Sequence, residues 1–567
     1  MKDESTIETL NFIASSMSDD QKEAFDELLL TVDQDFTVDM FSTIRAKTPL
    51  VYLTCKEEKR MLQYFGQFNK TRSSELFVWE AHRGLRDLQN PDSPINGSSD
   101  DDDDDAEAYD EEQVLDYIIK KAEKENKIKT KTNGSIFLLL DYHRYLGDED
   151  CAPVLERKLK NIFLASSKIT VFLVGPSYVA TESLEDYIKL LDFPFPGDKE
   201  INKEIDKISE NVKMKIPKIK EKIQNNRNRE DIIKACRGMT MQDVSAALSQ
   251  SIVRRRDFDI NTIIQTKKQT IQKGGLLEFI DPKVTLDDVG GLDPLVEWFM
   301  NRKIAMSDIA VESKVDTPRG ALLLGIAGCG KSLIAKGVAS AWGYPLLKLD
   351  FGALFGSLVG ESENNLRSVI KLAESIAPCI LWCDEMEKGT AGSSSSGTTD
   401  GGTTARVMQT LLTWMQEKTS PVFIIGTANN HGAIAPELFR RFDETWFVDN
   451  PGFVGREQIF KIQFKSRGID CDNLDIGKLV LDTDGYNGDE IRKVVNEALL
   501  EKLTIGAPEV TQQLLDKQIK DLVPLSLKKS EEIKLIRDWA SKNCRPANTK
   551  DPKKTIQDEK NYSDLET

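Results

Sequence analysis

The sequence predicts an α/β protein made of two successive parallel-sheet modules, the second of which carries a helical lid. Three observations predict it. A glycine-rich loop joins an apolar strand to a helix start at residues 325–332, a second apolar strand ends in the carboxylates of Asp384 and Glu385, and apolar strands alternate with helical segments through residues 1–270. Such alternation is typical of parallel sheets that helices cover on both faces.

The first 270 residues contain four apolar runs with the length and composition of buried strands. They lie at residues 49–53, 76–79, 136–141 and 169–174. Helical patterns occupy the intervals, at residues 57–68, 113–125 and 154–165. This order of elements predicts a doubly wound parallel sheet.

The loop at residues 325–332 has the pattern Gly-x-x-x-x-Gly-Lys-Ser and follows the apolar run 321–324. Its glycines allow successive backbone N–H groups to point at phosphates. Lys331 adds a positive charge, the Ser332 hydroxyl is placed for Mg²⁺, and the helix N-terminus favours an anion. The predicted phosphate-binding residues are Gly325, Ile326, Ala327, Gly328, Cys329, Gly330, Lys331, Ser332 and Leu333.

The apolar run 380–383 ends in Asp384 and Glu385. Ligands of open parallel sheets bind at the carboxyl ends of the strands. Asp384 is therefore predicted to hold the Mg²⁺ shell, and Glu385 to be the base that orients and polarises the attacking water. A strand that ends in a solvated acidic turn is the alternative, which the upstream phosphate loop disfavours. The sequence thus predicts that the chain binds and hydrolyses ATP.

Ordered motifs over residues 286–500 resemble those of the AAA ATPases. Residues 286–292 look like the entry motif beside the adenine, and residues 359–363 match the segment that carries the pore loop. Residues 426–429, 436–443 and 485–491 resemble the sensor, arginine-finger and lid motifs. The run 376–382 and the N-terminal half are similar to uncharacterised AAA proteins of cyanobacteria and algal plastid genomes.

The resemblance implies roles for further residues. Val289 and Gly290 are expected beside the adenine, and Asn429 beside the γ-phosphate. Arg440 or Arg441 is expected to reach the ATP of a neighbouring subunit. The lid residues expected to close on the base are Gly488 and Asp489.

Three departures from the family leave points open. Arg440 and Arg441 are adjacent, without the usual spacer, so either could be the finger. Leu358 stands where the pore loop often has an aromatic residue, which grips a threaded chain more firmly. Asp489 replaces the usual Ala, and it could accept a hydrogen bond from the base or point outward.

Residues 1–270 also resemble a diverged copy of the ATPase module. Residues 140–141 correspond to residues 383–384, residues 192–197 to 448–452, and residues 238–244 to 485–491. Residues 54–60 contain no glycine, and Tyr142 stands where the catalytic Glu would be. The copy is therefore predicted to be catalytically dead. An unrelated α/β domain with chance similarities is the alternative.

The net charge is −17, and ten acidic residues between positions 100 and 112 supply much of it. This balance disfavours broad nucleic-acid binding, which needs clustered Lys and Arg. The insertion near residues 90–112 is expected to be disordered, with a docking strip for a basic partner as the alternative. The cysteines lack the spacing of a disulfide framework, and no apolar run reaches eighteen residues, so a membrane span is not expected.

The expected organisation is a degenerate module at 1–270, a linker with the entry motif at 271–292 and an active sheet domain at 293–446. A helical lid at 447–545 and a disordered tail at 546–567 follow, and residues 389–404 are expected to be a flexible loop. The resemblance implies ATP and Mg²⁺ as cofactors, a homo-oligomeric ring, taken as a hexamer, and a protein client. It also implies a soluble protein of a cyanobacterial cytoplasm or an algal plastid stroma. A nucleotide-dependent switch or scaffold, or a nucleic-acid ATPase, is the alternative function.

Overall fold

The computed structural model describes residues 4–551 with gaps at 16, 30–31, 73, 89, 95–108, 128–133, 147–151, 166–167, 179–182, 214–225, 274, 352–353, 355–360, 391–400, 431, 433 and 435. Two predictions lie wholly or largely outside the described residues. One is the pore-loop residue Leu358, and the other is the central part of the acidic insertion, 95–108. The flanks of that insertion are ordered, because residues 90–94 form a strand and a helix begins at Glu111, so disorder was wrongly expected there.

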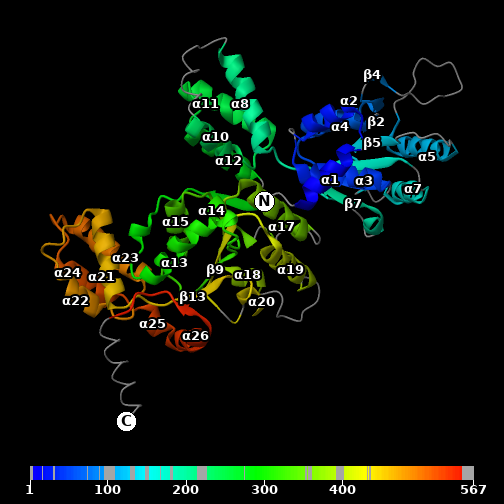
Figure 1. Cartoon of the computed structure of the whole chain (residues 1–567). Helices are drawn as coiled ribbons and strands as arrows, with labels where there is room; N and C mark the ends of the chain where they lie inside the picture. Colours follow the sequence, from blue (N-terminus) through cyan, green and yellow to red (C-terminus); the bar gives the residue numbers. More distant parts are fainter. Residues whose placement is uncertain are drawn as a thin grey trace. The chain divides into compact units, whose positions relative to one another are not determined.

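The chain divides into two compact units, residues 1–267 and 268–567 (Figure 1). The first unit contains a seven-stranded sheet in the order β4-β3-β2-β5-β6-β1-β7. Neighbouring strands from β2 to β7 are parallel, whereas β3 and β4 are antiparallel additions at one edge. The strands are β1 (Leu50–Thr54), β2 (Glu75–Glu80), β3 (Gly84–Asp87), β4 (Asn90–Pro94), β5 (Ser135–Leu140), β6 (Thr170–Gly175) and β7 (Lys189–Asp192).

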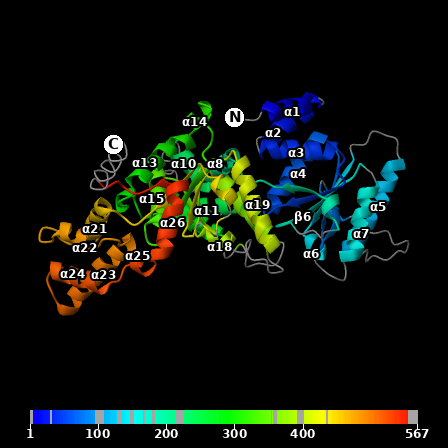
Figure 2. The same ribbon diagram turned by 90° about the horizontal axis from the view of Figure 1, so that it is seen from below.

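Helices cover both faces of this sheet because successive side chains of a strand point to opposite faces. Val51 and Leu53 pack into a core with the helices on one side, whereas Leu50 and Tyr52 pack into a second core on the other side. The first layer consists of α1 (Glu4–Ser15), α2 (Asp19–Leu28), α3 (Gln34–Arg45) and α4 (Glu58–Arg72). The second, in which α5 and α7 lie side by side (Figure 2), consists of α5 (Glu111–Lys127), α6 (His143–Leu146) and α7 (Ala152–Leu164).

A separate helical bundle completes the first unit. A short 3-10 turn, η1 (Glu185–Tyr187), and β7 precede it. Ile205, Val244 and Leu248 belong to a buried core of its own. The helices are α8 (Asp198–Lys213), α10 (Asn226–Cys236), α11 (Met241–Arg255) and the first half of α12 (Ile260–Lys273). The end of α12 belongs to the second unit, where Ile271 packs into the core.

The second unit repeats the strand order of the first. Its parallel strands run β13-β9-β12-β11-β10, so the first strand lies between the fifth and the fourth, as β1 lies between β7 and β6. This shared topology confirms the predicted fold of two AAA-like α/β modules. The strands are β8 (Leu277–Ile280), β9 (Gly320–Gly325), β10 (Leu346–Leu349), β11 (Cys379–Cys383), β12 (Val422–Ala428), β13 (Glu444–Val448) and β14 (Arg545–Pro546).

Two edge strands come from segments for which no strand was predicted. β8 arises from the expected linker and pairs antiparallel with β10, and β14 pairs in parallel with β13. Helices again form two layers on the sheet. One contains η3 (Leu286–Asp288), α13 (Asp293–Lys303), η4 (Ile304–Met306), α14 (Asp308–Glu312) and α15 (Lys331–Trp342), and the other contains α17 (Glu361–Ile376), α18 (Met386–Thr390), α19 (Gly401–Glu417) and α20 (Pro436–Phe439).

The expected loop 389–404 is shorter than predicted, since residues 386–390 and 401–417 are helical. Residues 391–400 lie outside the described residues. Within the described part of the chain, no helix combines the length and the apolar composition needed to cross a bilayer.

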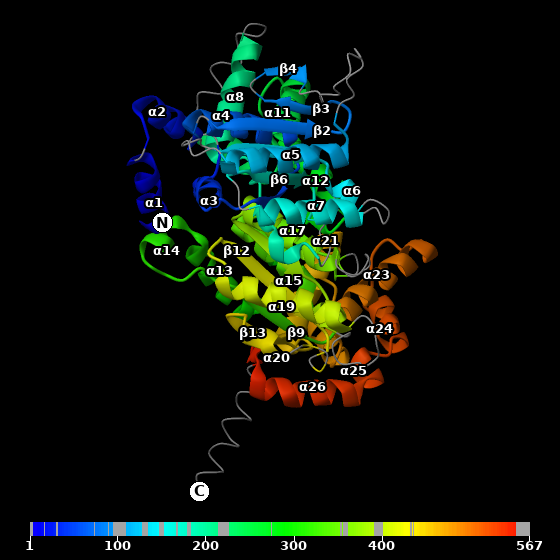
Figure 3. The same cartoon turned by 90° about the vertical axis from the view of Figure 1, so that its right-hand side faces the viewer.

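The C-terminal helices separate into a lid and helices that pack against the sheet domain (Figure 3). The lid has its own core, which includes Phe460, Val494 and Leu515. Ile536 and Ala540 instead pack into the sheet core, so the expected lid, 447–545, is longer than the real one. The lid helices are α21 (Phe453–Arg467), α22 (Ile476–Asp482), α23 (Gly488–Ile505) and α24 (Gln512–Asp521), followed by α25 (Leu525–Lys528) and α26 (Ser530–Asn543).

Residues 546–551 are ordered, contrary to the expected tail. The Ala547 N–H donates to the Phe447 carbonyl at 2.9 Å. The Asp551 carboxylate accepts hydrogen bonds from the N–H groups of Phe453 and Val454, at 2.8 and 3.0 Å, and so caps the first lid helix. Polar composition misled the prediction, because these polar side chains cap a helix and a strand end. Residues 552–567 lie outside the described residues.

This difference predicts the effect of truncation. Removal of residues 552–567 gives the reference melting temperature. Removal of 546–567 deletes the strand pair and the helix cap, and should lower it by about 5 °C or more, since each lost cap or hydrogen bond costs roughly 1 kcal/mol. Calorimetry of both truncations checks this, and equal melting temperatures would contradict it.

Candidate functional site

A cavity of about 500 Å³ lies in the second unit, between the carboxyl ends of the strands and the lid. It brings together residues that the sequence predicted from the phosphate loop, the acidic strand end, the entry motif, the sensor and the lid. The predicted residues that line it are Val289, Gly290, Ala327, Gly328, Cys329, Gly330, Lys331, Ser332, Leu333, Asp384, Glu385, Asn429, Gly488 and Asp489.

The phosphate loop needs its glycines for two physical reasons. Gly328 and Gly330 adopt positive φ angles of 81° and 96°, which L residues rarely adopt. Gly325 lies so close to β13 that an added Cβ would be 2.0 Å from the Val448 carbonyl oxygen. The loop then enters α15 at Lys331, so the helix N-terminus faces the cavity.

The Lys331 side chain is 7% exposed. Its ammonium donates to the carbonyl oxygens of Gly325 and Ile326, both at 2.8 Å. Gly325 and Ile326 thus lie behind the cavity wall, where they hold the Lys331 ammonium, and they do not line the cavity. Burial lowers the pKa of Lys331 to about 8, because desolvation disfavours the charged form. A phosphate group in the cavity would supply the anion that this buried cation lacks.

The Cys329 thiol is also buried in the loop. Its Sγ lies 3.3 Å from Asn450 Oδ1. Burial raises its pKa to about 12, and this outweighs the neighbouring Lys331 charge. A thiolate at this helix start is therefore not favoured at neutral pH, so Cys329 acts here as a small packing residue.

The two carboxylates at the end of β11 lie in different surroundings. Asp384 accepts a hydrogen bond from Thr427 Oγ1 at 2.6 Å, and its other oxygen lies 3.3 Å from Lys348 Nζ. Glu385 adopts the left-handed φ of 51°, pairs with the exposed Lys388, and donates its N–H to Thr427 Oγ1 at 3.3 Å. Asp384 is thus held by partners on both of its oxygens. The partner of the Glu385 carboxylate is instead the exposed Lys388 side chain, which can move away.

The predicted sensor residue Asn429 is oriented by Glu387, for which no role was predicted from the sequence. Its backbone N–H and its side-chain amide both donate to Glu387 Oε1, at 3.1 and 3.2 Å. Glu387 belongs to α18, which follows β11. The Asn429 side chain therefore lines the cavity in a fixed orientation.

The lid contacts the phosphate loop directly. Asn487 Nδ2 donates to the Ala327 carbonyl at 3.2 Å, and the Asp489 N–H donates to the Gly328 carbonyl at 3.1 Å. The Asp489 carboxylate accepts from Arg492 Nε at 3.0 Å. The sequence did not decide which way the Asp489 carboxylate points; in the structure it points toward Arg492.

The cavity has further lining residues that the sequence analysis did not identify. Ile459, Ile462, Gln463 and Ser466 come from α21, and Arg492 from α23. The α21 residues follow the i, i+3, i+4, i+7 spacing of one helix face. This spacing is the signal in the sequence that marks them as one face of a helix. The remaining lining residues are Asp288, Leu292 and Thr427.

The two candidate finger arginines do not line the cavity of their own chain. They follow α20, where Arg440 is exposed and Arg441 is half-buried. The structure leaves the choice between them open.

The residues present fit a magnesium ion that arrives with a nucleotide. Ser332 and Asp384 line one cavity and offer hard oxygen donors, which Mg²⁺ prefers. Among the described residues, no group of three or more His, Cys, Asp or Glu side chains could hold an ion alone. A single carboxylate and a hydroxyl suit Mg²⁺, because this ion keeps several waters and is shared with substrate phosphates.

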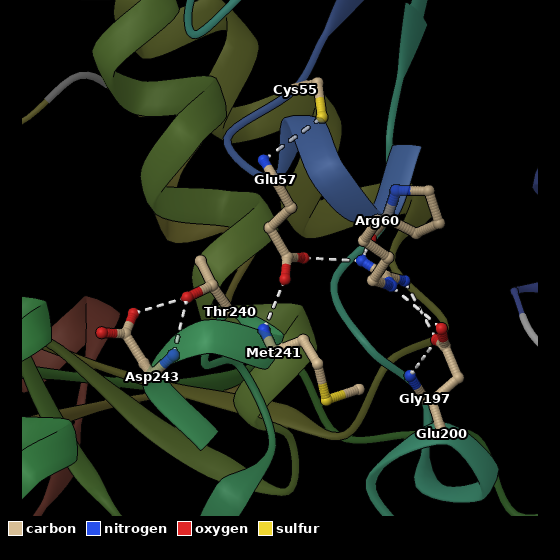
Figure 4. A network of polar contacts seen from close by, with 9 residues as sticks. Cys55, Glu57, Arg60, Gly197, Glu200, Thr240, Met241 and Asp243 are labelled. Carbon is tan, nitrogen blue, oxygen red and sulfur yellow. Dashed lines mark hydrogen bonds and ion pairs between the residues drawn. The ribbon is translucent and has the colours of Figure 1, made fainter. Parts of the chain in front are cut away.

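The corresponding edge of the first sheet carries a network of polar side chains (Figure 4). Arg60 donates to Glu57 at 2.6 Å and to both oxygens of Glu200 at 2.9 and 3.0 Å. Glu57 also accepts the N–H of Met241 at the start of α11. Tyr142 is fully buried, and its hydroxyl donates to the Glu111 carbonyl, so it does not reach this edge.

Comparisons with known proteins match the two units to different family models. Residues 321–450 match the ATPase family associated with various cellular activities (AAA). Residues 36–193 match the N-terminal domain of SpoVK-like AAA ATPases, and residues 199–274 match the second domain of that group.

Similar proteins cover most of the chain. It is 32% identical over 515 residues to the uncharacterized AAA domain-containing protein ycf46 of Guillardia theta, covering 89% of this chain and 95% of that protein. The same-named protein of Pyropia yezoensis is 33% identical over 516 residues, covering 89% and 98%. A cell division cycle protein 48 homolog of Archaeoglobus fulgidus is 30% identical over 282 residues, covering 48% and 36%. The chain belongs to the AAA ATPase family.

Proposed function

We propose that the second unit binds ATP with Mg²⁺ and hydrolyses it, and that the chain acts in an oligomeric ring that remodels a partner protein. The observation that carries the proposal is the single cavity shared by the buried Lys331, the paired carboxylates, Asn429 and the lid. These groups meet the requirements of phosphoryl transfer, in which positioning and charge stabilisation supply most of the catalysis.

Each side chain has a defined part in the proposed reaction. The loop N–H groups and Lys331 hold the β- and γ-phosphates. Glu385 leaves Lys388 and accepts a hydrogen bond from the attacking water. It takes the proton of that water as the new bond to the γ-phosphorus forms and the bond from this phosphorus to the β–γ bridging oxygen breaks, which releases ADP. Asn429 positions the same water or the γ-phosphate. Mg²⁺ bound near Ser332 and Asp384 would neutralise charge on the phosphate oxygens.

The proposed ring explains why neither candidate finger lines its own cavity. An arginine from a neighbouring subunit can stabilise charge on the transferring phosphoryl group, an effect worth about 10³–10⁵ in rate. Hydrolysis would then depend on assembly. A ring, taken as a hexamer, and a protein client follow from the resemblance to the family.

The first module has a different proposed role. Its phosphate position is filled by Arg60 and two carboxylates that are at most 11% exposed. The loop between β1 and α4 contains no glycine, so no row of N–H groups can wrap a phosphate. We assign to this module the shaping of the ring, the recruitment of a partner, or both, without nucleotide.

Stimulation of turnover separates the proposed function from its alternatives. Sustained turnover that a protein client accelerates supports remodelling, whereas slow turnover without stimulation supports a switch or scaffold. Acceleration by DNA or RNA at physiological salt would favour a nucleic-acid ATPase. A pull-down with an ATP-locked Glu385→Gln variant from the native cell would identify the client. A soluble location, in a cyanobacterial cytoplasm or an algal plastid stroma, is part of the proposal.

The first prediction separates binding from hydrolysis. Lys331→Ala should lose most nucleotide affinity, because a bound phosphate would lack its buried cation. Glu385→Gln should bind ATP with near-normal affinity and lose about 100-fold or more of turnover, because an amide cannot accept the proton of water. Calorimetry and a phosphate-release assay measure the two effects. Equal turnover of Glu385→Gln and the unchanged protein would refute the assigned base.

A second prediction concerns the arginines. Single Ala substitutions at Arg440 and Arg441 should leave ATP affinity near normal, and at least one should lower turnover by about 10³-fold. Mixing that variant with Lys331→Ala should restore some activity if the arginine acts across an interface. A mixture that co-assembles and remains inactive at every ratio would argue against action in trans.

A third prediction concerns the first module. The Glu385→Gln protein should bind one nucleotide per chain by calorimetry, and Asp141→Ala should leave turnover almost unchanged. Arg60→Ala provides the stricter test. If Arg60 merely blocked a competent site, its removal would admit a second nucleotide; we expect the stoichiometry to stay at one, because the loop still lacks backbone donors. Two nucleotides per chain, in either background, would overturn the degenerate-copy interpretation.

A further inference from the structure

The Asp384 carboxylate is held from both neighbouring strands. The sheet order places β11 between β12 and β10. Thr427, on β12, donates to Asp384 Oδ1 at 2.6 Å, and Lys348 Nζ, on β10, lies 3.3 Å from Asp384 Oδ2. Each oxygen of the carboxylate therefore has its own partner, one neutral and one charged.

Thr427 connects the two acidic residues. Its side chain is buried, at 2% exposure, and its hydroxyl also accepts the Glu385 N–H at 3.3 Å. Glu385 has a left-handed backbone, which costs energy for a residue with a Cβ unless its surroundings hold it. One hydroxyl thus fixes the orientation of Asp384 and supports the conformation that presents Glu385.

Lys348 places a positive charge beside a carboxylate that faces the expected metal position. Its ammonium lies 4.9 Å from the centroid of the Trp382 ring, and its side chain is 32% exposed. A half-exposed ion pair contributes little to folding stability. It still repels a second cation at short range, and a partly buried site screens that repulsion less than bulk water does.

We propose that Thr427 and Lys348 are positioning residues with opposite effects on divalent-metal binding at Asp384. Thr427 holds the carboxylate in its metal-binding orientation and so promotes binding. Lys348 neutralises the carboxylate before the metal arrives and so opposes binding. The free ion therefore gains too little at Asp384 to bind alone, and the metal enters together with the nucleotide phosphates. This inference rests on the proposed ATP site.

The chain offers matched controls for both residues. Thr427→Val keeps the shape and removes the hydroxyl, whereas Thr427→Ser keeps the hydroxyl. Lys348→Met removes the charge and keeps the apolar stem over Trp382. Lys336→Met removes another lysine at the same ring, whose ammonium is 5.6 Å from the centroid.

The test measures Mn²⁺ affinity by electron paramagnetic resonance, with and without ATP, in the Glu385→Gln background. In the presence of ATP, Thr427→Val should weaken Mn²⁺ binding about tenfold, which corresponds to the loss of one charge-assisted hydrogen bond. Thr427→Ser should stay within about twofold. Lys348→Met should tighten Mn²⁺ binding by about threefold or more, and Lys336→Met should leave it unchanged. Without ATP, only Lys348→Met should show measurable Mn²⁺ binding.

A second readout uses the active protein at saturating metal. Thr427→Val should lower kcat, because Glu385 loses its support, while ATP affinity remains near that of the unchanged protein. Thr427→Ser should restore kcat. A loss of ATP affinity equal to the loss of kcat would indicate general damage and overturn the positioning role of Thr427.

Opposite outcomes overturn each half of the proposal. Mn²⁺ affinity that is equal in Lys348→Met and Lys336→Met, or weaker in Lys348→Met, overturns the competing role of Lys348. Unchanged affinity in Thr427→Val overturns the role of Thr427. Failure of the proposed ATP site looks different, because the Glu385→Gln parent would then bind no ATP at all.

Discussion

The buried ammonium of Lys331 is the constraint on which the functional end of the second unit depends. The carbonyl oxygens of Gly325 and Ile326 accept its hydrogen bonds, yet burial still lowers its pKa to about 8. An anion bound beside the ammonium would stabilise its charged form and so offset the cost of desolvation. The glycine turn, the start of α15 and the lid contacts surround one cavity at this point, so a phosphate is the ligand whose charge and size fit.

The first unit meets the same constraint in another way. Arg60 is buried in the first turn of α4, the helix that follows the first strand of the module, and Glu57 and Glu200 neutralise it within the protein. Burial raises the pKa of Glu57, and the Arg60 charge opposes that shift. A buried ion pair that loses one partner is strongly destabilising. The two modules therefore differ in the source of the counter-anion. The first unit provides it from its own carboxylates, and in the proposed function the second unit takes it from a bound phosphate.

Local patterns predicted the sheets and most of the site, because strands of buried residues and glycine-rich turns have signatures within a few residues. The phosphate loop, Asp384 and Glu385 are examples. Long-range partners were not predictable from the chain alone. Lys348 and Glu387 carry no local signal, since their role depends on which strand or helix lies beside Asp384 and Asn429. The α26 helix and residues 546–551 likewise look like lid and tail in sequence, but tertiary packing returns them to the sheet.

The lid contacts show how occupancy of the site could be converted into motion. Asn487 and Asp489 bond to carbonyl groups of the very loop whose N–H groups would face the phosphate. A shift of that loop on binding or release of phosphate must therefore change or break these bonds. The position of the lid is thus thermodynamically coupled to the occupancy of the site. In the first unit, the start of α11 is instead held by a side chain, because the Glu57 carboxylate accepts the N–H of Met241. In the proposed function ATP does not bind the first unit, so we expect nucleotide-driven lid movement in the second unit and not in the first.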